Sequence, residues 1–361
     1  MEEKRKKGRM DYTLLLIVVF LVVIGLVILY STSAYNGQVK FHDSFYYLKK
    51  QAFATVLGIV LMLFVAGMDY HIWQRLAVFG YLAAVALSVA VMLFGREING
   101  SKRWLALGPF SFQPSEFAKV ALILFLADLV TKNVKTIGKM WTLCRIMFWI
   151  LPIVGLVGAS NLSTAIIILG IGVILIFVAS PKYAQFALMG LAGACFMGIF
   201  LALESYRLER LAIWRNPEKY EKGYQTLQGL YAIGSGGVFG VGLGNSVQKL
   251  GFVPEAQNDM IFSIICEELG LAGAGIIVFL FLLLIWRFFM IASGSRDLFG
   301  ALIATGAMAH MMIQVVLNIA VVTNTIPNTG ITLPFISYGG TSVMFLLIEM
   351  GLVLSVSQVV D

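Results

Sequence analysis

The chain has 361 residues, of which 59% are hydrophobic and 12% are charged, whereas a soluble domain carries roughly 25% charged residues. This composition excludes an ordinary soluble domain and predicts a membrane protein. The formal net charge of +7 does not indicate a nucleic-acid-binding protein, because basic residues crowd the extreme N-terminus, where they act as topology signals. The few cysteines and histidines are scattered without ligand-type spacing, which argues against a disulfide framework or a zinc site.

Apolar runs of about 17–25 residues, the length that crosses a bilayer, recur along the whole chain. We expect an all-α polytopic membrane protein in which residues 1–361 form a single domain after a cytoplasmic tail at 1–12. The ten expected spans are 13–31, 49–67, 76–94, 116–131, 146–159, 162–179, 185–204, 261–286, 298–322 and 341–358. The fifth span is short, which predicts a broken or tilted helix packed inside the protein.

The distribution of Lys and Arg predicts the orientation of the chain. With a cytoplasmic N-terminus, the inside segments hold more of these residues than the short outside loops, as the positive-inside rule requires. An even number of spans then returns the C-terminus to the cytoplasm. Two polar loops are therefore expected outside: one at 95–115 and one long extracytoplasmic loop at 205–260.

Two charged residues follow the first of these loops, at the start of the fourth span. Glu116 and Lys119 are three positions apart, so they share a helix face just inside the membrane. One interpretation is an internal salt bridge that neutralises two buried charges. In the other, Lys119 presents its ammonium to an anionic ligand, and the neighbouring charge of Glu116 modulates that ammonium. Both interpretations can hold together.

The long loop contains a glycine-rich segment. Glycines let backbone amides approach a phosphate closely, so one interpretation is a diphosphate cradle, while the favoured one is close packing of a re-entrant segment. A dinucleotide-binding fingerprint is rejected, because it requires a βαβ unit. The preceding run at 207–234 mixes basic and aromatic residues, which is typical of a helix at the membrane interface. The glycines are Gly234, Gly236, Gly237, Gly240, Gly242 and Gly244.

Asp259 is the candidate catalytic residue, since an ionisable group at the mouth of an apolar span is costly and marks a functional site. The alternative is a helix N-cap, because Asn258 and Asp259 directly precede an apolar run. Glu267 and Glu268 lie two turns deeper, about 80° and 180° around the helix axis from Asp259. We expect each glutamate to pair internally, whereas Glu349 in the last span has no partner that the sequence reveals.

Several long motifs occur in order along the chain. They are YSTSA at 30–34, NGSKRW at 99–104, QPSEFAK at 113–119, GYQTLQGLYAIGSGGVFGVGLG at 223–244, PEAQND at 254–259, EELG at 267–270 and GITLPFISYGG at 330–340. With these motifs the chain resembles the SEDS family (shape, elongation, division and sporulation proteins), most closely its FtsW and SpoVE branch. The resemblance covers nearly the whole chain.

This resemblance implies a peptidoglycan glycosyltransferase that polymerises lipid II into glycan strands at the outer face of the bacterial cytoplasmic membrane. It implies a role in division or sporulation, without deciding between them, and a class B penicillin-binding protein as the transpeptidase partner. Contacts with membrane lipids are expected, and nucleic acid is not. No cofactor is certain; a divalent cation could assist at the diphosphate, although no acidic cluster of ligand type is visible.

The resemblance also assigns residues. In the family, the Asp of a motif usually written H-T-D acts as catalytic acid or base, and Asp259 keeps this place after Gln257 and Asn258. A second family Asp, in the motif P-D-L-G-T-A, is replaced here by Asn161 within SNLSTA at 160–165. Any role of that second acid cannot be carried over as a charge. The buried polar pair of the fourth span matches the family pattern Q-P-S-E-x-x-K.

Elementary chemistry agrees with a single carboxylate. Inverting transfer from a lipid-diphosphate-linked sugar needs one carboxylate to accept the proton of the attacking hydroxyl, and Asp259 is the expected base. The diphosphate leaves as a stable anion, so cations that neutralise it matter more than a second acid. The predicted substrate-binding residues are Lys119, Glu116, Arg103, Arg210, Arg215 and Lys249. The predicted supporting residues are Asn161, Glu267, Glu268 and Ser337, and no metal site is predicted.

Two other functions remain open from the sequence. A lipid II flippase would also use polar residues in the spans, but the polar groups concentrate on the outer side, whereas a translocation path needs them at both ends. A non-catalytic scaffold would recruit and activate its class B partner through the apolar faces of outer spans. Replacing Asp259 without effect would favour the scaffold.

Overall fold

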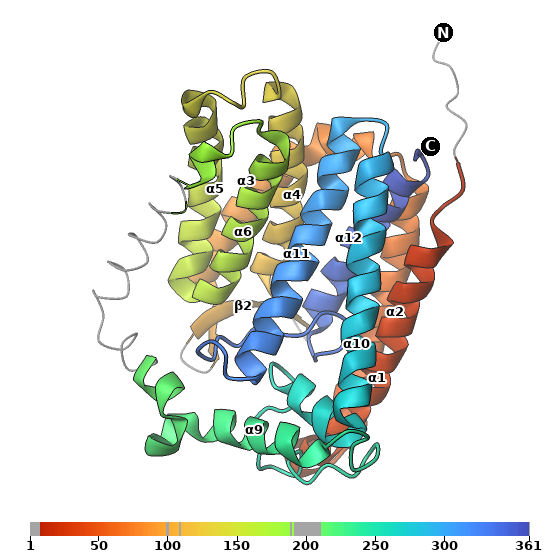
Figure 1. Ribbon diagram of the computed structural model, residues 1–361, viewed down its shortest axis with the longest axis vertical. Coiled ribbons are helices and arrows are strands. Elements are labelled where there is room, and N and C mark those ends of the chain that lie inside the picture. The colour runs from red at the N-terminus through yellow and green to blue at the C-terminus, as the bar shows by residue number, and fades with distance from the viewer. Residues whose placement is uncertain (1–7, 99–100, 108–109, 188–189, 191–210, 361) are drawn as a thin grey trace.

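The computed structural model describes residues 8–98, 101–107, 110–187, 190 and 211–360. Within these ranges the chain forms a bundle of long helices with a small antiparallel sheet at one end (Figure 1). The helices are α1 (Tyr12–Phe41), α2 (Tyr46–Gly67), α3 (His71–Phe94), α4 (Pro114–Asn133), α5 (Met140–Ser160), α6 (Leu162–Ala179), α9 (Tyr224–Gly236), α10 (Ile261–Gly294), α11 (Leu298–Val322) and α12 (Gly340–Ser357). The strands are β1 (Arg96–Ile98), β2 (Ser101–Leu107) and β3 (Phe110–Phe112), and two 3₁₀ turns are η1 (Pro217–Lys219) and η2 (Glu221–Gly223).

Among the described residues, eight helices are long and apolar enough to cross a membrane: α1, α2, α3, α5, α6, α10, α11 and α12. The expected all-α polytopic fold is therefore confirmed. α4 has the length of a span, 20 residues, but carries Glu116, Lys119, Asp128 and Lys132 and is buried along most of its length. The expected span at 185–204 falls largely outside the described residues.

The expectation of a short or broken helix at the fifth span was wrong. α5 has 21 residues and runs from Met140 to Ser160 with Pro152 inside it, so it is neither short nor broken. The sequence-based boundary stopped at Arg145, which in the structure lies within the helix. A long basic side chain near a helix end can extend toward the interface while its backbone stays helical, so a charge there does not end a span.

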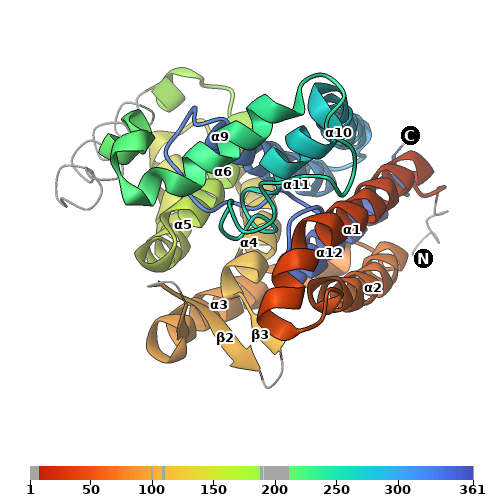
Figure 2. The same cartoon turned by 90° about the horizontal axis from the view of Figure 1, so that it is seen from below.

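α1 begins and α12 ends at the same end of the bundle, where the amide of Gly8 donates to the carbonyl of Gln358 at 2.7 Å. α9 lies across the opposite end, roughly perpendicular to the long helices, and the strands lie at that end too (Figures 1 and 2). The part of the chain expected as an outer loop, as far as it is described, is thus structured. It contains η1, η2 and α9.

α11 and α12 lie inside the bundle, where α12 packs on α2, and α11 packs on α4, α6 and α10. Most residues of α11 and α12 are buried, whereas α3 and α10 expose much of their apolar surface. Polar side chains on the enclosed helices cannot be solvated by the surrounding lipid or water. They must find partners within the protein, which brings the polar groups of α4, α11 and α12 together.

α10 is interrupted at Gly270, where φ is 66°. The glycine-rich segment 237–242 lies against the helix there and binds four backbone groups that a continuous helix would pair with one another. Its bonds, at 2.9–3.0 Å, run from the amides of Val241 and Gly242 to the carbonyls of Glu267 and Glu268, and from the amides of Leu271 and Ala272 to the carbonyls of Gly237 and Val238. Close packing of the glycine-rich segment is therefore the interpretation that the structure favours.

Candidate active site

Asp259 lies in the loop that precedes α10 and is 9% exposed. Its Oδ1 accepts a long hydrogen bond of 3.4 Å from Nε2 of Gln225 in α9. Its backbone carbonyl accepts a bond of 2.8 Å from Nδ2 of Asn318 in α11. The residue that caps α10 is Met260, so the alternative interpretation of Asp259 as the helix cap is wrong. Its carboxylate is instead held between α9 and the chain that follows α11.

Burial raises the pKa of Asp259 from 3.8 to about 6, because the ionised carboxylate loses hydration. The bond from Gln225 lowers the pKa and offsets part of this rise, while the nearby charge of Glu255 raises it further. A carboxylate with such a pKa is mostly ionised at neutral pH and is a stronger base than an ordinary aspartate. These are the properties that a general base requires.

The loop that follows α11 closes the other side of Asp259. Nδ2 of Asn328 donates to Oε1 of Gln225 at 3.3 Å, which joins this loop to α9. Gly330 has a φ of 70°, and a Cβ at this position would come within 3.9 Å of Oδ2 of Asp259. Asn318 donates to the carbonyl of Ile331 at 2.7 Å as well as to that of Asp259. One amide therefore fixes both the carboxylate segment and the loop beside it.

Lys119 is buried, with 2% of its surface exposed. Its Nζ lies 3.1 Å from Oε1 of Glu116 and 3.2 Å from Oε1 of Gln314 in α11. The expected salt bridge is thus confirmed. An ammonium has three N–H donors, and Lys119 has no further hydrogen-bond partner among the described residues. The ionic pair therefore does not saturate the cation.

α11 connects this cation to the carboxylate. Gln314 bonds Lys119, and Asn318, four residues further along the same helix, bonds the segment of Asp259. Four residues advance a helix by about 6 Å and return to the same face. The backbone carbonyl of Asp259 and the ammonium of Lys119 thus bond to consecutive turns of one face of α11, and Glu116 pairs with that ammonium.

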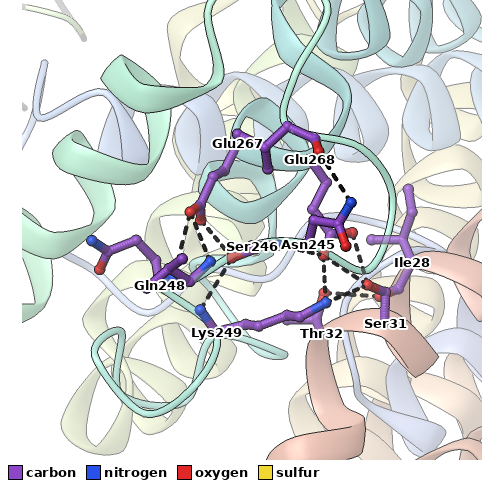
Figure 3. A network of polar contacts seen from close by, with 11 residues as sticks. Ile28, Ser31, Thr32, Asn245, Ser246, Gln248, Lys249, Glu267 and Glu268 are labelled. Atoms are coloured by element: carbon purple, nitrogen blue, oxygen red, sulfur yellow. Dashed lines mark hydrogen bonds and ion pairs between the residues drawn. The ribbon is translucent and has the colours of Figure 1, made fainter.

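Lys249 is paired elsewhere. Its Nζ lies 2.6 Å from Oε1 of Glu268 and 2.9 Å from Oγ of Ser31 in α1 (Figure 3). The Ser31 hydroxyl also contacts Glu268, at 2.7 Å from Oε2. The expectation that Lys249 offers its charge to a diphosphate does not fit this arrangement, because Glu268 already neutralises that charge. Lys249 instead joins the loop to α1 and α10, a link that we name the Lys249–Glu268 latch.

Glu267 binds the same loop at the residues just before Lys249. Its carboxylate accepts bonds from the hydroxyl of Ser246 and from the amide of Val247, the latter at 3.0 Å (Figure 3). Both glutamates therefore pair internally, as expected. Together they hold the turn at 246–249 against α10, ten residues before Asp259.

Two of the three predicted arginines lie among the described residues. Arg103 in β2 donates from Nε to the carbonyl of Ser160 at 3.0 Å, and it lines a cavity of about 10 Å³ with Ser115 and Asn161. Arg215 is exposed beside an open cavity of about 520 Å³. Arg210 lies outside the described residues.

Two supporting residues have structural partners. Asn161 caps α6 by accepting a bond from the amide of Thr164 at 3.3 Å. The hydroxyl of Ser337 accepts from the amide of Leu333 at 2.8 Å and so stabilises the loop before α12.

Sequence reasoning missed Gln225, the side-chain partner of Asp259, and the partner of Glu349. Nδ1 of His310 lies 2.8 Å from Oε2 of Glu349, and Nε2 of His310 lies 2.8 Å from Oε1 of Gln314. A signal for this pair was present, because His310, Gln314 and Asn318 form a polar stripe at four-residue spacing on an otherwise apolar helix. No group of three or more metal-ligating side chains occurs among the described residues.

Comparisons with known proteins agree across nearly the whole chain. A family model described as cell cycle protein, of the FtsW, RodA and SpoVE type, matches residues 12–361. The chain is 40% identical to stage V sporulation protein E of Bacillus subtilis, over 98% of both chains. It is 35% identical to a probable peptidoglycan glycosyltransferase FtsW of Trichlorobacter lovleyi, over 96% of this chain and 93% of that protein.

Solved structures show the same fold. A chain of a peptidoglycan synthase complex that coordinates polymerization and crosslinking matches with a TM-score of 0.82 and 30% identity, over 96% of this chain and 97% of that one. The rod shape determining protein RodA of Thermus thermophilus matches with a TM-score of 0.72 and 29% identity, over 96% of both chains. The chain therefore belongs to the FtsW, RodA and SpoVE family of multi-pass membrane proteins.

Proposed function

We propose that this chain is a peptidoglycan glycosyltransferase that polymerises lipid II into glycan strands at the outer face of the bacterial cytoplasmic membrane, during division or sporulation. The names of its relatives support this activity. The observation that carries the proposal is a buried carboxylate of raised pKa, Asp259, together with a buried ammonium, Lys119. The backbone carbonyl of Asp259 and the ammonium of Lys119 bond to consecutive turns of α11.

In the proposed reaction Asp259 is the general base. It accepts the proton of an acceptor sugar hydroxyl as the hydroxyl oxygen attacks the anomeric carbon of the donor. The new glycosidic C–O bond forms on the face opposite the leaving group, so the configuration inverts. The bond from the anomeric carbon to the lipid diphosphate breaks, and the diphosphate keeps the electron pair. The proton then passes from Asp259 to solvent.

Cations stabilise the departing diphosphate in this proposal. Lys119 is the principal one, because an ammonium in a buried, water-poor site acts more strongly on a developing charge than one in water. Glu116 and Gln314 hold this ammonium in place. Arg103 and Arg215 are proposed to attract the anionic substrate at the rim of the site, and Arg210 is proposed to add its positive charge to this attraction.

The proposed orientation places both termini in the cytoplasm and α9 outside. The excess of Lys and Arg in the inside segments supports it. We also propose a class B penicillin-binding protein as partner, contacting the exposed apolar faces of the membrane helices. The likeness to a chain of a peptidoglycan synthase complex supports such an assembly.

The test uses the purified complex of this chain with its class B partner and lipid II in detergent, with glycan followed on a gel. We expect polymer from the native complex and none from Asp259→Asn. The matched control is Asp128→Asn, which changes a buried carboxylate bonded to Gln74 and Lys132. This control should retain polymerisation, and full activity of Asp259→Asn would contradict the assignment.

The same proteins separate the two alternative functions. If neither the native complex nor its variants make polymer, transport of lipid II across vesicle membranes tests the flippase. A scaffold would tolerate Asp259→Asn in cells, whereas changes on the outer faces of the spans would abolish its function.

A further inference from the structure

A buried pair of titratable groups lies next to the proposed site and has no role in the reaction as described. His310 in α11 and Glu349 in α12 are each 1% exposed, and Nδ1 and Oε2 are 2.8 Å apart. Burying such groups is costly, so each needs a partner. The other ring nitrogen of His310 contacts Gln314, which in turn contacts Lys119. Four side chains thus form one connected row from α12 through α11 to α4.

The hydrogen bonds of Gln314 fix the direction of this row. Its Nε2 donates to the carbonyl of Thr332 at 3.1 Å, so its amide oxygen is the atom that faces Lys119 and His310. An amide oxygen only accepts hydrogen bonds. Nε2 of His310 must therefore carry a hydrogen, and the proton of the contact with Glu349 lies on either Nδ1 or the carboxyl group.

We propose that His310 and Glu349 are positioning residues for Lys119. Glu349 fixes the imidazole ring through Nδ1, so that Nε2–H of His310 donates to the oxygen of Gln314, and this oxygen orients the ammonium. Without Glu349, Nδ1 of His310 loses the partner that fixes the ring. The imidazole can then turn so that its Nε2–H no longer reaches the oxygen of Gln314, and the anchor of Lys119 would move.

This inference rests on the proposed function of Lys119, and two measurements test it separately. The first is kinetic and uses the complex with lipid II. We expect Glu349→Leu to lower kcat at least tenfold with less than a threefold change in KM. The position of the ammonium of Lys119 affects the transition state, in which the diphosphate departs, more than it affects substrate binding. Glu349→Gln should stay within threefold of the native kcat, since its amide N–H can donate to Nδ1 and preserve the hydrogen on Nε2.

A double-mutant cycle distinguishes positioning from a purely structural pairing. Lys119→Met should itself lower kcat, and adding Glu349→Leu should cause no further loss, because the residue that the row orients is gone. If Glu349→Leu lowered kcat by the same factor in the native protein and in Lys119→Met, the proposal would be overturned. A fully active Glu349→Leu would also overturn it, as would a loss in Glu349→Gln as large as that in Glu349→Leu.

The second measurement does not depend on activity or on the stability of the leucine variant. The chain has only three histidines, so ¹⁵N-labelled histidine gives few signals, and His310→Asn identifies the relevant one. We expect Nε2 of His310 to be protonated in both the native protein and Glu349→Gln. A neutral ring protonated at Nδ1 in the native protein would overturn the proposal. If Lys119→Met instead polymerises normally, the kinetic role assigned to Lys119 is wrong. The spectrum still shows whether Nε2 of His310 is protonated, and so tests the hydrogen bond to Gln314 separately.

Discussion

The ammonium of Lys249 and the carboxylate of Glu268 form a buried ion pair at 2.6 Å, which fastens the loop that bears Asp259 to the helix that follows it. Breaking a buried pair by removing one partner costs about 3–5 kcal/mol, because the other charge stays buried and unpaired. We therefore expect Lys249→Met to lower the apparent melting temperature in detergent. Adding Glu268→Gln removes the stranded charge and should restore part of the loss.

A surface pair serves as the control for the latch. Lys49 and Asp43 are 2.8 Å apart but exposed, and such a pair contributes about 0–1 kcal/mol. Lys49→Met should therefore leave the melting temperature nearly unchanged. A double variant at the latch that is less stable than Lys249→Met alone would contradict the role of the latch.

The raised pKa of Asp259 predicts the pH dependence of polymerisation. A general base acts only when it is ionised, so kcat/KM should increase as pH rises through about 6 and level off above it. Initial rates at low lipid II concentration, between about pH 5 and pH 8, measure this profile. Asp128→Asn should show the same profile, and a native profile that is flat across this range would exclude Asp259 as the base.

The same pKa predicts that the ionised carboxylate of Asp259 lowers the stability of the fold. Its folded pKa of about 6 exceeds its ordinary value of 3.8, so the folded state binds more protons between these values. Stability therefore falls as pH rises through this window, by up to about 3 kcal/mol. Asp259→Asn should be more stable than the native protein at about pH 7.5, and the difference should shrink toward pH 5. Thermal unfolding at both pH values checks this, and a less stable variant at pH 7.5 would speak against it.

Two glycines of α9 give a matched pair of substitutions. A Cβ at Gly236 would lie 1.9 Å from the carbonyl oxygen of Cys266, whereas a Cβ at Gly234 meets no atom within 4 Å. Gly236→Ala should push α9 away from α10, lower stability by about 1–3 kcal/mol and reduce polymerisation, because α9 carries Gln225 beside Asp259. Gly234→Ala should keep the native stability and the native polymerisation rate. The melting temperature and the initial rate of each variant measure these effects. Equal values for the two variants would contradict the close contact of Gly236 with the carbonyl of Cys266.

The spans could be predicted from the sequence because hydropathy alone sets which segments enter a bilayer. α4 was recognised as a long helix despite its four charges, although it is not among the eight described helices apolar enough to cross a membrane. The position of Asp259 just before a long apolar helix could also be predicted from the sequence. The partners of buried charges could not, because they depend on how helices distant in sequence turn toward one another. Two examples of such pairs are Glu349 with His310 and Lys249 with Glu268.

The small sheet was also missed. Strand β2 pairs with β1 and β3 within residues 96–112, a segment that sequence reasoning treated only as a polar loop. It is too short to stand out against the apolar runs around it. Its pairing nonetheless carries Arg103 toward Ser160 at the edge of the site.

The break in α10 has a consequence for how the protein assembles. The amides of Leu271 and Ala272 have no partners within their own helix at Gly270, and the segment that satisfies them, 237–242, is made by the ribosome before α10. We expect the inner part of α10 to enter the membrane first as an ordinary helix. Its outer turns join only once the earlier loop has folded back beside them, so the site becomes complete late in biogenesis.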